Sequence, residues 1–200
     1  MGDNNNKNVK LPPGFRFYPT DEELLVHFLR RKASLLPCHP DVIPDLDLYP
    51  YDPWDLHAKA LAEGNQWYYY SRRTQNRVTE NGYWMPMGME EAVIGGGGSN
   101  TKVIGMKKYF VFYLGDGVKT NWLMQEYRLS DSASTSAKSS SSSKTKSHPK
   151  PDRSKWVICR VYECDEDNDS GGGGGDGTEL SCLDEVFLSL DDLEEISLPN

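Results

Sequence analysis

Residues 67–90 read WYYYSRRTQNRVTENGYWMPMGME and set the architecture expected of this chain. The aromatic start of this stretch favours a β-strand, because aromatic side chains pack well on a pleated surface. Its end cannot be helical, since Pro86 and Gly88 both interrupt helices. Pro86 also lacks the N–H group that a central strand must donate, so residues 84–89 are predicted to form an edge strand or an exposed ribbon.

The polar loop between the two aromatic segments carries Arg72, Arg73 and Arg77. Arginines beside an exposed ribbon suit a surface that meets a nucleic-acid backbone and enters a groove. A solvated hairpin loop with ordinary surface arginines fits the same composition. The loop alone therefore leaves both interpretations open.

Charge is unevenly distributed along the 200 residues, whose net charge is −8. Residues 164–200 hold 12 acidic side chains and no Lys or Arg, whereas residues 1–163 carry 22 basic against 18 acidic side chains. A mildly basic body joined to an acidic tail is an asymmetry found in nucleic-acid binders that have an interaction tail.

The chain offers no constellation for enzyme or metal chemistry. Its four histidines lack partners, and the glycine run at 95–98 lacks the Lys-Ser/Thr of a phosphate-binding loop. The four cysteines have no histidine at zinc-ligand spacing, so free thiols are expected, with no catalytic residue, metal or cofactor. No apolar run approaches the roughly 20 residues of a membrane span, and the polar N-terminus predicts no signal peptide.

The pattern predicts an α+β fold class, with helices near the N-terminus and a mostly antiparallel sheet. Thr20 and Glu23 form a capping box for a helix that runs to about Ala33. Asp52 and the following proline start a second helix, expected to run to about Leu61. Strands are expected at 103–114, 119–129 and 156–162, with a hairpin turn at 116–117.

Low-complexity segments predict the domain organisation. The Asn-rich residues 1–7 and the Ser/Lys/Thr-rich residues 130–152 are expected to be disordered, the latter as a loop within one domain at 8–163. Residues 164–200 alternate acids with large apolar side chains and are too short to bury them. They are predicted to be a disordered acidic regulatory tail that folds on a partner.

Five blocks, in this order, resemble the NAC domain of plant transcription factors. They read LPPGFRFYPTDEELL at 11–25, DPWDL at 52–56, WYYY at 67–70 with GYW at 82–84, GMKK at 105–108 with EYRL at 126–129, and WVICRVY at 156–162. The resemblance covers about residues 8–163. It implies a twisted antiparallel sheet that binds double-stranded DNA in the nucleus, as a homodimer or as a heterodimer with other NAC proteins.

The opening block of this family builds the dimer contact. The resemblance therefore implies that Leu11, Arg16 and Glu23 lie at a dimer interface, with Arg16 of each protomer pairing with Glu23 of the other. The alternative is that these three residues only cap and pack their own helix.

The family reads DNA with the ribbon after Gly-Tyr-Trp, where its usual motif is WKATGKD. Here the segment reads WMPMGME, so Met85 and Met89 replace two lysines and Met87 replaces a threonine. Each lost phosphate contact weakens DNA binding and lowers, by about one, the magnitude of the slope of the logarithm of the binding constant against the logarithm of the salt concentration (the salt slope). An apolar ribbon can instead meet thymine methyl groups or a protein surface. The DNA-binding set expected on this basis is Arg72, Arg73, Arg77, Thr79, Trp84, Met85, Met87, Lys102, Lys107, Lys108, Lys119 and Arg128.

The short chain, the methionine-rich ribbon and the acidic tail are similar to those of family members that restrain development. The implied function is negative regulation of xylem vessel differentiation, secondary-wall formation and programmed cell death. The alternative is a dimerising adaptor that makes little DNA contact and sequesters other NAC proteins or a retinoblastoma-related protein.

Leu180, Cys182 and Asp184 in the tail resemble the Leu-x-Cys-x-Glu peptide that docks in the retinoblastoma pocket, with one methylene fewer at the acid. The apolar side chains of Phe187, Leu190 and Leu193 follow. The rival interpretation is a plain acidic-hydrophobic activation segment, since five-residue patterns are weak alone.

Overall fold

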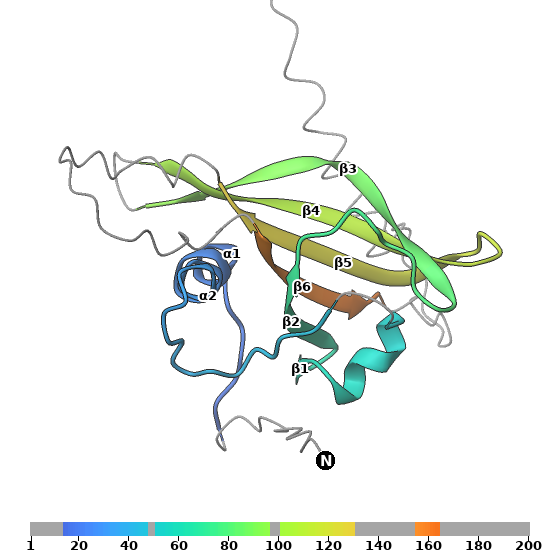
Figure 1. Cartoon of the computed structure of the whole chain (residues 1–200), viewed down its shortest axis with the longest axis horizontal. Helices are drawn as coiled ribbons and strands as arrows, with labels where there is room; N and C mark the ends of the chain where they lie inside the picture. Colours follow the sequence, from blue (N-terminus) through green and yellow to red (C-terminus); the bar gives the residue numbers. More distant parts are fainter. Residues whose placement is uncertain (1–13, 48–50, 97–100, 131–154, 165–200) are drawn as a thin grey trace, which may run out of the picture.

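The computed structural model describes residues 14–47, 51–96, 101–130 and 155–164, and these form a twisted sheet flanked by short helices (Figure 1). Apart from Ser130 and Cys164, the segments predicted to be disordered lie outside the described residues, as do Leu11 of the dimer set and the whole motif of the tail at 180–193. No helix in the described ranges is long and apolar enough to span a membrane. The α+β class is confirmed.

One continuous helical segment opens the described chain, made of α1 (Asp21–Glu23), the π-helical η1 (Leu24–Leu29) and α2 (Arg30–Ala33). The predicted capping box is confirmed, because the Glu23 N–H donates to Thr20 Oγ1 at 3.2 Å and the Thr20 N–H donates to the Glu23 carboxylate at 2.9 Å. Leu25 and Leu29 are fully buried against the sheet. Burial of this apolar stripe fixes the helix on one face.

The second helix is shorter than predicted. It is a 3₁₀ helix, η2 (Pro53–Ala58), and Asp52 caps it as expected. Residues up to Leu61 do not continue it, because Leu61 begins β1 (Leu61–Glu63) and pairs with Tyr68. Gly64 makes the tight turn possible, since its φ of +59° is a left-handed conformation that other residues rarely adopt.

Six antiparallel strands form the sheet in the order β1-β2-β6-β5-β4-β3. Their bounds are β2 (Gln66–Arg72), β3 (Gly82–Gly95), β4 (Lys102–Leu114), β5 (Lys119–Leu129) and β6 (Trp156–Glu163), besides β1. The ribbon after Trp84 therefore lies in the edge strand β3, as Pro86 predicted. A bulge interrupts the pairing of β3 with β4 between Met87 and Glu91, and Gly88 lies in it with a φ of +60°.

The two faces of the sheet bury different side chains. The helical face packs Leu25 and Leu29 against Tyr68, Tyr127 and Ile158. The opposite face packs around aromatic side chains and η2; its buried residues include Leu56, Trp67, Trp84, Phe110, Phe112, Trp122 and Met124. A side chain's place in the β alternation therefore decides which of the two surfaces it can serve.

The cysteine expectation holds in part. Cys38 and Cys159 are buried free thiols. Cys164, which directly follows β6, is disulfide-bonded, and this contradicts the expectation of free thiols throughout. Spacing along the chain could not reveal this, because a disulfide depends on how close two Cα atoms lie in space.

Candidate nucleic-acid interface

Arg77 lies on the sheet face opposite the N-terminal helix, held by a carboxylate and an aromatic ring. Its guanidinium donates to both oxygens of Glu126, at 2.9 and 3.2 Å, and stacks 3.9 Å from the centre of the Phe110 ring. Lys108 approaches the same ring at 5.9 Å and lies directly across from Glu126 in the β4–β5 pairing. Arg77 and Lys108, far apart in sequence, are therefore neighbours on one face.

Arg128 joins this group through Glu90 in the bulge of β3. The Arg128 Nε donates to Glu90 at 3.3 Å, and its Nη2 pairs with the other carboxylate oxygen. The hydrogen bond from Arg128 lowers the pKa of Glu90 against the opposing effect of burial, and the charges of Arg128, Lys108 and Arg73 lower it further. The Glu90 carboxylate therefore lies within the electrostatic influence of all three cations.

We call Arg73, Arg77, Lys108 and Arg128 the basic cluster; with Glu90 and Glu126 it carries an excess of two positive charges. Arg73 is exposed, while Arg77 and Arg128 are largely committed to their carboxylates. Guanidinium groups make bidentate contacts to phosphate as well as to carboxylate. The cluster can therefore bind a polyanion, though weakly for its number of cations.

Met85 and Met89 are exposed on β3, by 45% and 71%; Met85 lies before the bulge and Met89 within it. Pro86, between them in sequence, is exposed too and lies opposite Phe110 in the β3–β4 pairing. An exposed two-stranded β ribbon fits a major groove about 12 Å wide. The basic cluster and the edge of β3 together make the candidate interface.

Three of the predicted DNA contacts are buried in the fold. Trp84 is 3% exposed and packs edge-on against Phe112 at 5.1 Å, and Met87 is 7% exposed. Thr79 is buried as well, and its hydroxyl donates to Asp52 at 2.5 Å. These side chains support the interface from inside the fold, because burial leaves them little surface for DNA.

Lys107, also in the predicted set, faces the helix rather than the basic cluster. It pairs with Asp21 of α1 at 3.2 Å and with Glu91 of β3 at 3.0 Å. Burial alone would lower the pKa of Lys107, but hydrogen bonds with Tyr109 and Glu91 and the charge of Asp21 raise it overall. Neighbouring residues of a strand point to opposite faces, so Lys107 and Lys108 cannot share one patch.

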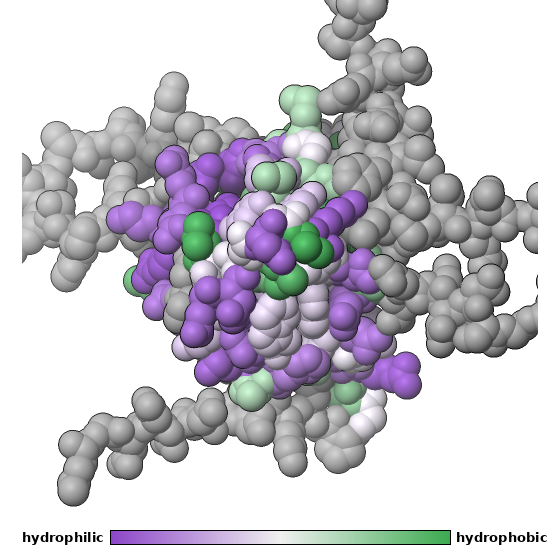
Figure 2. Space-filling view, turned by 90° about the vertical axis from the view of Figure 1, so that its right-hand side faces the viewer, coloured by the Kyte–Doolittle hydropathy of each residue, from purple (hydrophilic) through white to green (hydrophobic). Residues whose placement is uncertain are grey.

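The remaining predicted cations do not join the cluster. Arg72 stacks 3.7 Å from the centre of the Trp156 ring. Lys102 and Lys119 are exposed at opposite ends of the β4–β5 ribbon, roughly 35 Å apart by strand length. Figure 2 shows the end that holds the β4–β5 turn, where hydrophilic side chains surround a few separate apolar ones. Scattered apolar residues of this kind do not mark a docking face.

Sequence reasoning missed the carboxylates that organise the interface. A signal for Glu126 was present, because it alternates with Trp122 and Met124 on one face of β5 and a charge in such a stripe needs a buried partner. Asp52 was predicted only as a helix cap. It also accepts hydrogen bonds from Thr79 and, at 2.6 Å, from the Asn81 side chain, so it anchors the loop that carries Arg77.

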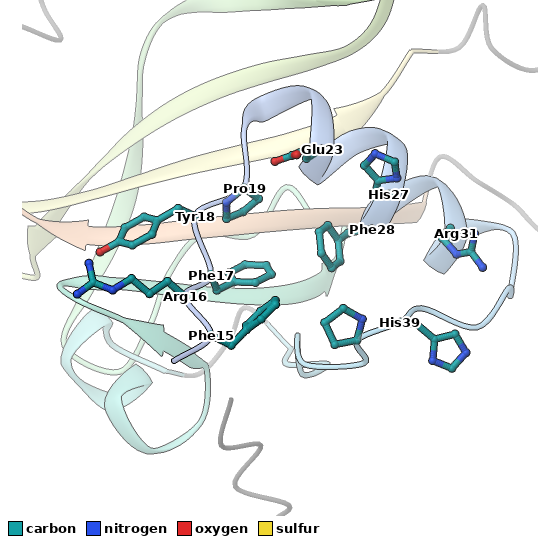
Figure 3. Close-up of a pocket in the computed structure, with 11 residues that line it drawn as sticks. Phe15, Arg16, Phe17, Tyr18, Pro19, Glu23, His27, Phe28, Arg31 and His39 are labelled. Carbon is teal, nitrogen blue, oxygen red and sulfur yellow. The ribbon is translucent and has the colours of Figure 1, made fainter. Parts of the chain in front are cut away.

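The two described residues of the predicted dimer contact, Arg16 and Glu23, line one pocket of about 430 Å³ (Figure 3). Arg16 extends beside Tyr18, away from the helix, while Glu23 stays in its first turn. Within the described residues no carboxylate pairs with Arg16. Phe15 and Tyr18 beside it are 47% and 60% exposed. The structure brings the two residues to the same surface.

Two kinds of evidence place this chain in a protein family. The first is the twisted antiparallel sheet with its basic edge, together with the sequence blocks at 11–25 and 105–129. The second is a match to a family model. The model of the No apical meristem (NAM) protein family matches residues 12–129. The chain therefore belongs to the NAM family, that is, to the NAC domain family of plant transcription factors.

Individual relatives agree with this membership. The chain is 69% identical over 193 residues to NAC domain-containing protein 104 of Arabidopsis thaliana, covering 96% of this chain and all of that protein. It is 43% identical over 164 residues to NAC domain-containing protein 18 and 42% to NAC transcription factor 29, both from Arabidopsis thaliana, covering 76% of this chain in each case. The matches span 50% and 57% of those two proteins.

Proposed function

We propose that this protein regulates transcription in the nucleus by binding double-stranded DNA as a homodimer or as a heterodimer with other NAC proteins. The observation that carries the proposal is the basic cluster beside the exposed edge of β3. The cluster has an excess of two positive charges and adjoins an exposed β-strand edge that can enter a major groove. This arrangement supports contact with a phosphate backbone. Arg73, Arg77, Lys108 and Arg128 are the proposed phosphate contacts.

The proposed biological role is negative regulation of xylem vessel differentiation, secondary-wall formation and programmed cell death. Its support is the sequence similarity described above, in the methionine ribbon and the acidic tail. A NAC protein whose arginines are held by carboxylates binds DNA weakly, so in a heterodimer it reduces the affinity of its partner for DNA.

Met85→Lys is expected to strengthen DNA binding severalfold at low salt. Met85 is 45% exposed on β3, so a lysine there can reach a phosphate without disturbing the core. One new phosphate contact in each protomer raises the salt slope by about one per protomer. Fluorescence anisotropy with a fixed duplex at two salt concentrations measures both quantities.

Leu36→Lys is the matched control, because Leu36 is 53% exposed after the N-terminal helix and away from β3. It adds the same charge to the protein at a different place. Equal gains for both variants would show that net charge, and not the ribbon, governs the affinity. A wild-type protein that dimerises with other NAC proteins but shows no salt-dependent DNA binding would favour the sequestering adaptor instead.

A pocket protein of the retinoblastoma class is the proposed partner of the tail, through Leu180, Cys182 and Asp184. The support is the motif alone, since the tail lies outside the described residues. Full-length protein is expected to bind such a pocket protein in calorimetry, and the Leu180→Ala Cys182→Ala variant is expected to lose at least tenfold in affinity, about 1.4 kcal/mol. Equal binding by both would make the motif a chance match and leave a generic activation segment.

A further inference from the structure

The exposed surface of β3 around its bulge is apolar. Met85 and Met89 are exposed while Met87, between them, is 7% exposed and packs inward. Pro86 and Gly88 add no hydrogen-bonding side chain, and the carboxylate of Glu90 is turned to Arg128. A molecule that meets this ribbon therefore meets two methionine side chains first.

The bulge holds Met89 in a defined position. Gly88 has a φ of +60°, which turns the chain there, and the next residue after Met89 is tied by its carboxylate to Arg128 on β5. The ribbon is thus fixed on both sides of Met89, by the β4 pairing before the bulge and by this ion pair after it. A methionine presented on a fixed backbone can select between ligands while its flexible thioether adapts to their shape.

Base edges in a major groove offer these side chains one apolar feature, the C5-methyl group of thymine. The other groups that the bases display there are hydrogen-bond donors and acceptors, which a thioether cannot match well. Met85 pairs with Val111 and therefore points to the sheet face opposite Phe110 and the basic cluster, but the cluster reaches the same edge strand through Glu90. Its cations supply the charge complementarity for the phosphates on one side of a groove that receives this edge. Phosphate contacts position the protein, and the ribbon is left to read the bases.

We propose that Met85 and Met89 read C5-methyl groups in the major groove, so that this protein selects duplexes by the methyl groups of their pyrimidines. The inference rests on the proposed DNA-binding function and specifies its ligand. Thymine is the ordinary carrier of this group, and 5-methylcytosine presents the same methyl at the same place. Burying one methyl group at the interface should raise the affinity about fourfold, because this corresponds to the free energy of burying a single CH₂ unit.

The test uses the full-length protein and a duplex enriched from a random library by the protein itself. Its affinity is measured by anisotropy for this duplex and for a copy in which deoxyuridine replaces every thymidine, which removes only the C5-methyl groups. The wild-type protein is expected to bind the deoxyuridine duplex about 4- to 16-fold more weakly, for one to two methyl contacts. The salt slope should be the same for both duplexes, because the phosphates are unchanged.

Two variants make the assignment specific. The double variant Met85→Gln Met89→Gln keeps the side-chain length but is polar, so its affinities for the two duplexes should agree within about twofold. The double variant Met85→Leu Met89→Leu stays apolar and should keep the preference for the thymidine duplex. Both positions are exposed, so an unchanged thermal midpoint is expected and confirms the fold.

The outcomes separate this inference from the function on which it rests. Equal wild-type affinity for both duplexes, with normal salt dependence, would overturn methyl readout and leave DNA binding intact. A preference for thymidine that persists in the glutamine variant would overturn the role of the two methionines, because DNA shape would then explain it. Failure to enrich any duplex would overturn the proposed function, and the inference with it.

Discussion

Replacing Arg77 with alanine is expected to lower the free energy of unfolding by about 3 kcal/mol. The side chains of Arg77 and Glu126 are 17% and 7% exposed, and the guanidinium donates to both carboxylate oxygens. Removing the arginine leaves a carboxylate buried without this counterion, which is costly because the group has also lost its water. Lys108 lies directly across from Glu126, so the cost falls at the lower end for broken buried pairs.

Guanidinium chloride unfolding measures this loss, as a shift of the midpoint at constant slope. Arg73→Ala is the matched control, because Arg73 is an exposed arginine of the same loop and should change stability by less than about 0.5 kcal/mol. Arg77→Ala combined with Glu126→Gln removes the stranded charge and should recover at least half of the loss. If Arg77→Ala unfolds at the same midpoint as Arg73→Ala, Arg77 does not stabilise the fold, and DNA binding would be its only proposed role.

Reversing the charge at Arg16 is expected to raise the dissociation constant of the dimer roughly 100-fold, about 2.7 kcal/mol. In a two-fold interface each contact occurs twice, so Arg16→Glu would place two carboxylates against Glu23 residues in one step. Like charges that face each other across an interface cost several kcal/mol. Sedimentation at micromolar concentration should therefore show mostly monomer for the variant and dimer for the wild type.

Glu23 allows a control that the capping box makes possible. Glu23→Gln removes the charge but keeps an oxygen that can accept from the Thr20 N–H, so the helix start should be preserved. It is expected to weaken the dimer without changing the unfolding midpoint of the monomer. A dimer population unaffected by Arg16→Glu would assign both residues to packing and capping within their own protomer, the alternative that the sequence left open.

Much of the fold could be predicted from local patterns. The capping box at Thr20, the Asp52 cap and the edge position of the strand holding Pro86 each follow from residues that lie near one another in sequence. Helix η2 ended early because a turn at Gly64 and a three-residue strand followed it. Short strands of this kind are decided by a neighbour, here β2, and carry little pattern of their own.

The candidate site was predicted less well, although the residue types were suitable. The arginines and lysines in the loop and on β4 indicated a polyanion ligand. Counting them, however, overestimated how many positive charges face the candidate interface. Lys107 faces the helix, Arg72 stacks on Trp156, and Trp84 lies in the core. Motif positions alone cannot separate such residues, since a one-residue difference along a strand moves a side chain to the other face.

The sequence by itself determined that this chain has a basic body and an acidic tail, where its first helix begins, and that residues 84–89 form an edge. Only the tertiary structure decided which cations remain for a ligand. Arg77 and Glu126 are 49 residues apart, and Arg128 and Glu90 are 38 apart. Each pair exists because strand register brings two distant positions to the same face. Charge composition adds up along a chain, but the field at a surface depends on which charges neutralise one another in space.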